Sequence, residues 1–343
     1  MGVVNLYKNV FIGENYPVYI IAEIGSNHNQ SLELAKESIL AAKESGADAV
    51  KFQSINVNEL YYKPLKSTIN LHKKIDFDEK WHFILKKFCD THSIAFFSSP
   101  TYLKAIDILE GINVVCYKLA SAQIGTFPQL VKKVAETGKP VFLSTGIVLR
   151  KELDRVIDIF KNAGNNKYIL LHCNSIYPTP YEKVHLNLIT SYKKQYNCVV
   201  GFSDHTIGTH VPGFAVSRGA RIIEKHFTLD KTLPVPDATF SLNPEEFKQM
   251  VAQIRIAEKV TISGQRKSLE KEENSFKESI LYKLVLNKNI GKNETLNVSD
   301  FLYKRHPGGI DCRKINEIVG KKINSDLQKG DLLETKHLKT DEN

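Results

Sequence analysis

The stretch Gly201-Phe-Ser-Asp-His-Thr206, followed by Ile223-Glu-Lys-His-Phe-Thr228, decides the fold class. In each, a short apolar run leads into polar residues that can bind or catalyse. Residues 209–219 between them have helical character, so the sequence predicts strand, helix and strand. Such a βαβ unit holds its strands parallel, which places His205 and His226 at the same end of one sheet. Two neutral imidazoles can share a divalent metal, although histidines held in ordinary hydrogen-bond networks are the alternative.

Composition excludes several classes of function. The chain has 343 residues, enough for one large domain and a small one. Its net charge of +9 is spread over lysines on amphipathic helices, and no basic and aromatic cluster matches a nucleic-acid module. No apolar run approaches the roughly 20 residues of a membrane span, and no signal-peptide pattern opens the chain. We therefore expect no nucleic-acid partner, no membrane association and, from five scattered cysteines, a reducing cytoplasmic environment.

Strand and helix patterns alternate eight times along the first three quarters of the chain. The predicted strands cover residues 18–22, 49–53, 94–97, 114–119, 140–143, 168–172, 199–202 and 221–223. The predicted helices cover residues 31–45, 78–92, 102–110, 127–137, 151–163, 188–196, 209–219 and 244–260. Eight βα units predict an α/β fold of the (β/α)8 TIM-barrel type. A doubly wound open sheet is the alternative, but there only strands near the switch point should end in polar residues, and here all eight do.

The remaining segments fall outside the repeat. Residues 1–17 read as a hairpin or arm, and residues 55–75 as a long polar connection of the kind that often forms a lid. After residue 262 the chain becomes polar and then shows short alternating β-runs. We predict a barrel domain over residues 1–262, a linker over 263–282 and a small β-rich domain over 283–343. About 60 residues cannot build a large core, so we expect the small domain to pack on a barrel.

The polar strand ends include two lysines, Lys51 and Lys118, on inward positions. Burying an unpaired ammonium group is costly, and a bound anion would satisfy both lysines. Serine and threonine hydroxyls at the same barrel mouth could supply neutral donors to phosphate or carboxylate oxygens. The alternative is that the lysines pair with Glu23 and Glu224 and hold the barrel together. A lysine forming a Schiff base, as in class I aldolases, is a further alternative.

Six runs of the chain resemble the sialic acid synthases, which are N-acetylneuraminate and related nonulosonate synthases. These runs are Ala22-Glu-Ile-Gly-Ser-Asn-His28, Tyr117-Lys-Leu-Ala-Ser121, Leu143-Ser-Thr-Gly146, Tyr177-Pro-Thr-Pro180, Gly201-Phe-Ser-Asp-His-Thr206 and Glu224-Lys-His-Phe-Thr228. The C-terminal part, with Lys304-Arg305 and Pro307-Gly-Gly309, resembles the family's antifreeze-like (SAF) domain. The resemblance covers nearly the whole chain, and the runs occur in the family's order and spacing.

The resemblance implies a condensation of phosphoenolpyruvate with the open-chain aldehyde of an N-acetylated hexosamine. The product is a nine-carbon 2-keto sugar acid, and phosphate leaves by C–O cleavage. The resemblance also implies a divalent metal, manganese, held by two histidines, which would polarise the aldehyde carbonyl. It further implies a homodimer in which the small domain of one subunit brings Arg305 to the barrel of its partner.

The residues that match the family's site are predicted as follows. The predicted catalytic residues are Glu23, Lys51, Lys118, Gln123, His205 and His226, the two histidines being the metal ligands. The predicted substrate-binding residues are Ser99, Ser121, Ser144, Ser175, Tyr177, Ser203, Glu224, Asp237 and Arg305.

One position departs from the family's pattern. Many members carry an acidic residue where this chain has Gln123. A glutamine can orient a water but cannot take its proton at neutral pH, so another group, with Glu23 as the candidate, would do that work. The alternatives are a different substrate, a slow enzyme, or a catalytically dead carbohydrate-binding homologue. Retention of both histidines and both lysines argues against the last of these.

Overall fold

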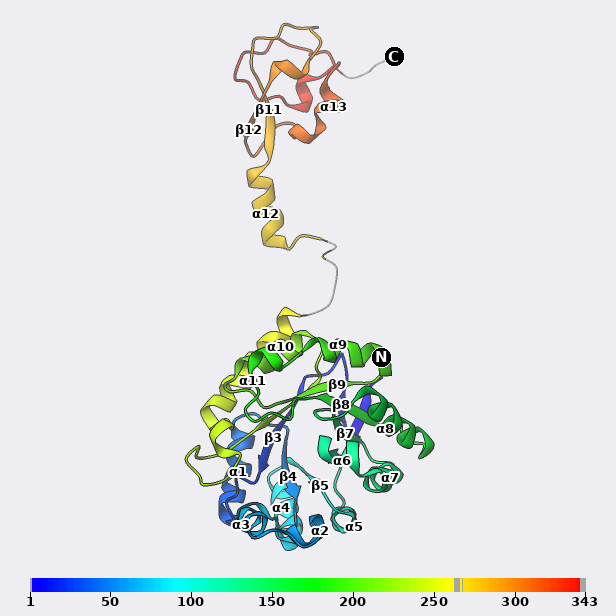
Figure 1. The fold of residues 1–343 in the computed structure, drawn as a ribbon. Coiled ribbons are helices and arrows are strands. Elements are labelled where there is room, and N and C mark those ends of the chain that lie inside the picture. The colour runs from blue at the N-terminus through cyan, green and yellow to red at the C-terminus, as the bar shows by residue number, and fades with distance from the viewer. Residues whose placement is uncertain (1, 262–265, 267, 340–343) are drawn as a thin grey trace. The chain divides into compact units, whose positions relative to one another are not determined.

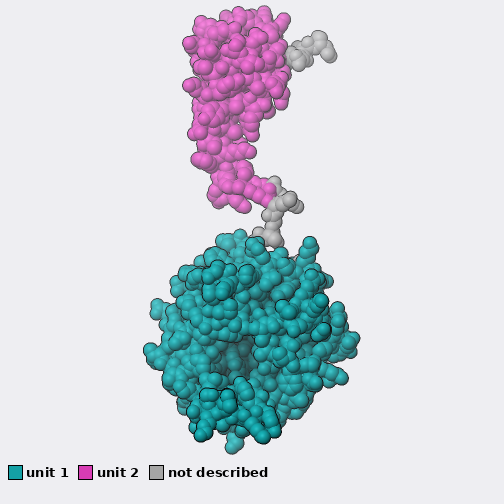
Figure 2. All heavy atoms as spheres, viewed as in Figure 1, with its two compact units in different colours: residues 1–262 teal, residues 263–343 magenta. Residues whose placement is uncertain are grey.

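The computed structural model of the protein describes residues 2–261, 266 and 268–339. The chain divides into two compact units, residues 1–262 and 263–343, coloured teal and magenta in Figure 2. The predicted boundary at residues 262 and 263, the first residues of the predicted linker and the predicted end of the small domain at residue 343 lie outside the described residues.

Eight parallel strands form the centre of the first unit (Figure 1). They are β3 (Tyr19–Gly25), β4 (Ala49–Ser54), β5 (Ala95–Pro100), β6 (Tyr117–Leu119), β7 (Val141–Ser144), β8 (Tyr168–His172), β9 (Val200–Asp204) and β10 (Ile222–His226). Their order in the sheet is β5-β4-β3-β10-β9-β8-β7-β6. Strands β5 and β6, at the two ends of this order, also contact each other, so the sheet closes into a nearly complete barrel. The predicted barrel is confirmed.

A helix follows each strand and covers the outside of the barrel, as Figure 1 shows. These helices are α1 (Leu32–Glu44), α4 (Glu79–Thr91), α5 (Leu103–Gly111), α6 (Ser121–Thr126) with α7 (Pro128–Glu136), α8 (Arg150–Asn162), α9 (Asn187–Tyr196), α10 (His210–Ser217) and α11 (Pro244–Val260). Local signals fix their ends: the Ser31 side chain accepts from the Leu34 amide at the start of α1. In α11, Asn243 and Glu246 form a capping box before an apolar face. Among the described residues, none of the helices is both long and apolar enough to cross a membrane.

Several strands run further than the sequence pattern indicates. Strand β3 continues through Glu23, β5 through Ser99, β9 through Asp204 and β10 through His226. A parallel ladder is made by the backbone, so it continues past the apolar run as long as the polar side chains find partners. The consequence for the site is that most of its residues stand on rigid strands rather than on loops.

The predicted lid over residues 55–75 contains two helices that the sequence analysis missed, α2 (Val57–Leu60) and α3 (Lys66–Ile75). Asn56 caps α2 by accepting from the Asn58 amide, and Asp76 accepts from the Val57 amide at 3.1 Å. The Phe77 amide donates to the Ile55 carbonyl at 2.9 Å, which closes the base of the segment. The polar composition of the segment did not indicate these helices, because α2 has no buried residue and α3 buries only His72.

The barrel has two apolar layers, one between strands and helices and one inside. Side chains alternate along each strand, so the inward set of β10 is Ile222, Glu224 and His226. The inward-facing side chains of each strand are apolar near its amino end and polar near its carboxyl end. The barrel therefore has an apolar core at the amino end and a polar pocket at the carboxyl end. Gly201 makes this core possible, because an added Cβ would lie 2.6 Å from Leu171 Cδ2 and 2.7 Å from Ile222 Cβ.

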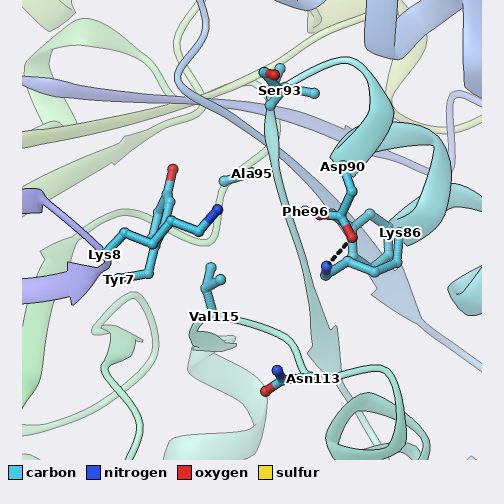
Figure 3. A pocket seen from close by; sticks show the side chains of 10 residues that line it. Tyr7, Lys8, Lys86, Asp90, Ser93, Ala95, Phe96, Asn113 and Val115 are labelled. Carbon is cyan, nitrogen blue, oxygen red and sulfur yellow. Dashed lines mark hydrogen bonds and ion pairs between the residues drawn. The ribbon is translucent and has the colours of Figure 1, made fainter.

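The amino end of the barrel is covered by the predicted N-terminal hairpin, β1 (Val4–Tyr7) and β2 (Val10–Ile12). Val4, Leu6 and Ile12 are buried in the same cluster as the lower inward side chains. Beside the hairpin lies a hollow of about 450 Å³, where Lys86 pairs with Asp90 (Figure 3). It lies at the amino ends of the strands, opposite to the polar pocket.

The second unit is small and β-rich, with the antiparallel pair β11 (Tyr282–Leu286) and β12 (Phe301–Arg305). Helix α12 (Lys271–Ile280) precedes this pair of strands within the unit, and the short helix α13 (Ile315–Ile318) follows it. Its apolar core includes Leu284, Leu296 and Leu333, which are fully buried. This unit therefore has a small core of its own.

Candidate active site

A cavity of about 240 Å³ opens at the carboxyl end of the barrel strands. Twelve of the fifteen predicted site residues line it, namely Glu23, Lys51, Ser99, Lys118, Ser121, Gln123, Ser144, Tyr177, Ser203, His205, Glu224 and His226. All eight strands, or the turns directly after them, contribute to this one pocket, β8 through Cys173. This convergence is the arrangement in which TIM barrels place their active sites.

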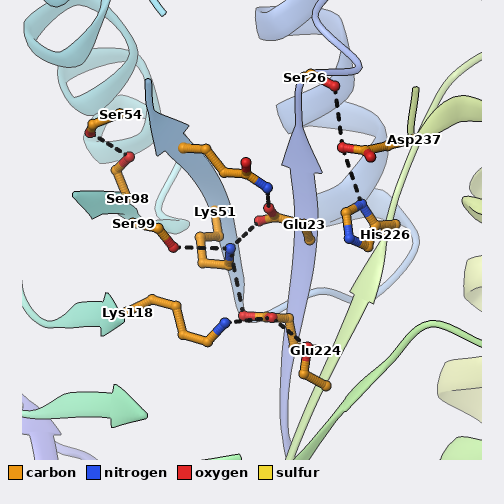
Figure 4. A network of polar contacts seen from close by, with 12 residues as sticks. Glu23, Ser26, Lys51, Ser54, Ser98, Ser99, Lys118, Glu224, His226 and Asp237 are labelled. Carbon is orange, nitrogen blue, oxygen red and sulfur yellow. Dashed lines mark hydrogen bonds and ion pairs between the residues drawn. The ribbon is translucent and has the colours of Figure 1, made fainter. Parts of the chain in front are cut away.

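Two lysines and two glutamates form the charged centre of the cavity (Figure 4). Lys51 Nζ lies 2.6 Å from Glu23 Oε2 and 3.8 Å from Glu224 Oε2. Lys118 Nζ lies 2.9 Å from Glu224 Oε1. All four side chains are buried, so each charge depends on its partners rather than on water. The pairing that the sequence left as an alternative is thus present, and both ammonium groups still face the cavity.

The network fixes the ionisation of its members. Burial would raise the pKa of Glu224, but Lys118 and Lys51 outweigh it and lower that pKa to about 2. Burial likewise opposes the charged form of Lys51, and the Glu224 and Glu23 carboxylates outweigh it and raise the pKa of Lys51. Lys51 is therefore a cation at neutral pH, suited to bind an anion and poorly suited to act as a nucleophilic amine.

Serine hydroxyls surround this charged centre. Ser99 Oγ lies 3.3 Å from Lys51 Nζ, and Ser203 donates to Glu224 at 2.8 Å. The Ser144 hydroxyl is buried and has no hydrogen-bond partner in the described part of the chain, so it is free to donate to a bound anion. Ser175 is not a lining residue, but its hydroxyl lies 3.1 Å from that of Ser121.

Gly146 lets the hydroxyls of Ser121 and Ser175 approach each other. A Cβ at this position would lie 2.4 Å from Ser175 Oγ and 3.1 Å from Ser121 Oγ. The same Cβ would lie 3.0 Å from the sulfur of Cys173, which also lines the cavity. The glycine of the run Leu143-Ser-Thr-Gly146 is therefore required by close packing at the pocket wall.

His205 and His226 face each other across one side of the cavity, with ring centroids 5.5 Å apart. His205 Nδ1 lies 2.7 Å from the Asn174 carbonyl, which can only accept, so Nδ1 carries the proton and Nε2 has a free lone pair. His226 Nδ1 lies 3.7 Å from Asp237 Oδ2. Burial, aided by the neighbouring His226, lowers the pKa of His205 to about 3, so this imidazole is neutral at physiological pH.

These two side chains fit a divalent metal in their chemistry. His205 has a carbonyl acceptor at Nδ1, the arrangement that orients Nε2 of a metal-binding histidine. His226 Nδ1 is buried and has no hydrogen-bond partner among the described residues, since the Asp237 carboxylate lies beyond hydrogen-bond distance. The described residues contain no group of three or more histidine, cysteine, aspartate or glutamate side chains that could hold a metal. A metal held here would therefore take two protein ligands and complete its coordination with water or substrate oxygens.

A second hollow, of about 490 Å³, adjoins the first and shares His226, Tyr177 and Gln53 with it. Asp237 lines this hollow rather than the first cavity. The Tyr177 ring lies 4.3 Å from His205 and 5.7 Å from Phe240, so one wall is aromatic. The site thus has a charged compartment and a larger compartment with an aromatic wall, with His226 between them.

Arg305 is the one predicted site residue that does not belong to the barrel unit. It ends β12, and its guanidinium lies 5.3 Å above the Tyr282 ring. Its contact with a substrate stays a prediction.

The structure adds a residue that the sequence analysis did not select. Gln53 Nε2 donates to Glu23 Oε1 at 2.6 Å, while Lys51 holds the other carboxylate oxygen of Glu23. Glu23 is thereby oriented by two donors on β4, one charged and one neutral. The alternation of Lys51 and Gln53 on one strand was the available signal, because residues two apart face the same side. Gln123, on α6, lines the cavity, and its catalytic role stays a prediction.

Fold and site together define a TIM-barrel protein with a pocket lined by buried lysines and serines beside a pair of histidines. The NeuB family matches residues 38–266. An uncharacterised protein of Methanocaldococcus jannaschii is 41% identical over 94% of this chain and 95% of its own length. N,N'-diacetyllegionaminic acid synthase of Legionella pneumophila is 35% identical over 95% of this chain and 96% of its own. The crystal structure of the N-acetylneuraminic acid synthetase of Leptospira borgpetersenii superposes with a TM-score of 0.75 at 35% identity, covering 81% of this chain and 97% of that one. The chain belongs to the NeuB family.

Proposed function

We propose that this protein is a nonulosonic acid synthase, a transferase that joins phosphoenolpyruvate to the aldehyde of an N-acetylated hexosamine. The observation that carries the proposal is the cavity in which Lys51, Lys118 and a ring of serines lie beside His205 and His226. The charged compartment suits the carboxylate and phosphate of phosphoenolpyruvate. The larger compartment, with Tyr177 and Phe240 on its wall, suits the sugar.

The proposed reaction forms one carbon–carbon bond and breaks one carbon–oxygen bond. The methylene carbon of phosphoenolpyruvate bonds to the aldehyde carbon, and the aldehyde oxygen takes a proton and becomes a hydroxyl. A water then adds to C2, and the C2–O bond to phosphate breaks, which leaves a 2-keto acid and inorganic phosphate. A divalent ion, for which manganese is proposed, would supply Lewis-acid polarisation of the aldehyde carbonyl when bound to His205 and His226.

Residues of the chain have separate tasks in this scheme. Lys51 and Lys118 compensate the charge of the anion, and Ser144 has a hydroxyl free to donate to it. Glu23, oriented by Gln53, takes the proton of the attacking water, a task that Gln123 cannot perform. The Schiff-base alternative is disfavoured because both lysines are ion-paired and the pKa of Lys51 is raised.

The remaining expectations belong to the same proposal. The second unit would be an antifreeze-like SAF domain, and in a homodimer it would bring Arg305 to the sugar in the partner's barrel. A cytoplasmic location fits phosphoenolpyruvate as substrate and five cysteines that are all free.

The test is a sugar panel. The full chain is mixed with phosphoenolpyruvate, manganese and N-acetylmannosamine, 2,4-diacetamido-2,4,6-trideoxymannose or N-acetylglucosamine, and phosphate release and product mass are measured. We expect release with at least one of the first two sugars, with a product heavier than the acceptor by phosphoenolpyruvate plus water minus phosphoric acid. His205→Ala should abolish that release. No release with any sugar would favour the carbohydrate-binding homologue instead.

A further inference from the structure

A buried ion pair, Asp204 with Lys225, lies directly behind the two histidines. The two residues are partners in the register of β9 and β10, and each immediately precedes a histidine. Side chains alternate along a strand, so this pair lies on the face of the barrel wall opposite to His205 and His226. Both side chains are about 1% exposed, and Lys225 Nζ lies 2.6 Å from Asp204 Oδ2. Neither residue lines the cavity, so neither has a task in the reaction described above.

The pair also forms hydrogen bonds with Thr206, the residue after His205. Lys225 Nζ donates to the Thr206 carbonyl. Asp204 accepts from the Thr206 amide at 2.9 Å and from its hydroxyl at 3.1 Å. The residues on both sides of His205 are therefore tied to the residue before His226. Through these bonds, the position of one histidine backbone is fixed relative to the other.

Stability alone is a weak reason for such a pair. Removing two charges from water costs several kcal/mol, and well-packed apolar residues of similar volume often stabilise a protein as well or better. An apolar pair in this place would not, however, bind the Thr206 carbonyl and amide. What the ion pair adds is a fixed geometry at the ends of β9 and β10, where the two imidazoles begin.

We propose that Asp204 and Lys225 are positioning residues that set the separation of His205 and His226 and thereby the affinity for a divalent ion. This inference rests on the proposed metal site. The pair acts through the backbone of the ligands and touches neither substrate. With this pair, the residues that shape the site include some in the layer between strands and helices as well as those that line the cavity.

The experiment measures manganese binding to the full chain by the electron paramagnetic resonance signal of the free ion. Lys225→Met keeps an unbranched side chain that is one atom shorter, and it removes the charge and the donors. We expect it to weaken manganese binding by about 10- to 100-fold, the range found when partners of metal ligands are lost. Phosphoenolpyruvate affinity, measured by calorimetry without metal, should stay at the wild-type value, because the lysines and serines of the cavity are untouched.

Two further variants separate positioning from folding. Asp204→Asn with Lys225→Met leaves no unpaired buried charge, so its melting temperature should exceed that of Lys225→Met while manganese binding stays weak. This double variant carries the test if the single variant does not fold. Ile169→Ala, in the lower core of the barrel, serves as the matched control. It should lower the melting temperature and leave manganese binding unchanged.

The outcomes are distinct. Weak manganese binding in both Lys225 variants, with wild-type binding in Ile169→Ala, supports the proposal. Wild-type manganese binding in the Lys225 variants, whatever their melting temperature, overturns it. If His205→Ala binds manganese as well as the wild type does, the metal site itself is wrong, and the positioning role is overturned with it.

Discussion

Lys118 is the residue whose replacement should separate the two proposed substrates. Its ammonium group is buried and faces the charged compartment beside Glu224. We expect Lys118→Ala to weaken phosphoenolpyruvate binding by roughly 2–5 kcal/mol, the usual cost of removing one partner of a buried charge pair. Binding of the sugar should change far less, and calorimetry with each substrate measures both.

Lys86→Ala is the control for Lys118→Ala. Lys86 also pairs with a carboxylate, but it lies at the hollow on the amino end of the barrel. Its replacement should leave both affinities unchanged. Equal losses for the two substrates in Lys118→Ala, or a loss of phosphoenolpyruvate binding in Lys86→Ala, would contradict the placement of the anion.

Much of the site could be predicted from residue types alone, and the reason is geometric. In a parallel barrel every strand ends at the same mouth, so Glu23, Lys118 and His226 meet although they are far apart in sequence. The partnerships inside the site could not be predicted in the same way. Gln53 donates to Glu23, and Lys225 donates to the Thr206 carbonyl. These hydrogen bonds depend on side-chain conformations that residue types do not specify.

At the scale of elements, the strand positions followed from apolar runs, whereas the lid helices did not. Helices α2 and α3 are short and polar, and Asn56 and Asp76 stabilise the first of them through single hydrogen bonds. Helix α2 has only four residues, too few to show a period of 3.6 residues, and α3 buries only His72, so no buried apolar stripe signals either helix. The predicted strands β3, β5, β9 and β10 end too early, because backbone hydrogen bonds continue after the apolar run has given way to polar side chains.

The interior of the barrel gives a test of strand packing at Gly201. A methyl group there would meet Leu171 and Ile222 at under 3 Å, so we expect Gly201→Ala to destabilise the protein by about 1–3 kcal/mol through overpacking. Gly111→Ala, at the end of α5, is the matched control, since nothing lies within 4 Å of its added methyl. Urea unfolding followed by the fluorescence of Trp81 measures both. Similar midpoints for the two variants would contradict the packing described here.

The segment after β3 carries a pH-dependent contribution to stability at His28. This ring is buried against Phe77 and Trp81, and burial lowers its pKa to about 4. Above pH 6.5 neither the folded nor the unfolded chain protonates it, so it has no effect. As pH falls from 6.5 to 4, the unfolded chain takes up a proton that the folded chain does not, and folding is destabilised by about 3 kcal/mol.

His28→Asn removes this titration and should lose correspondingly less stability across the same pH range. Asn can still accept the hydrogen bond that His28 Nδ1 receives from the Gln30 amide. Urea unfolding of both proteins at several pH values, again followed by Trp81, gives the difference. Parallel pH profiles for the two proteins would show that His28 does not titrate as described.

At the scale of the whole molecule, the proposed exchange of small domains can be tested by mixing two inactive variants, His226→Ala and Arg305→Ala. After subunit exchange, a mixed dimer has one barrel with intact histidines that receives an intact arginine from its partner. Activity should return, to roughly half of the wild-type level per mixed dimer when the sites are independent. If subunits exchange and no activity returns, Arg305 does not act across the dimer.

The central claim, that the barrel mouth condenses phosphoenolpyruvate with a sugar aldehyde by C–O cleavage, is tested most directly by isotope transfer. Phosphoenolpyruvate labelled with ¹⁸O at the oxygen between carbon and phosphorus is converted with manganese and the sugar that the panel identifies. Mass spectrometry of both products should find the label in the inorganic phosphate and none in the keto acid. Label retained in the keto acid, or phosphate released without any new sugar acid, would contradict the account.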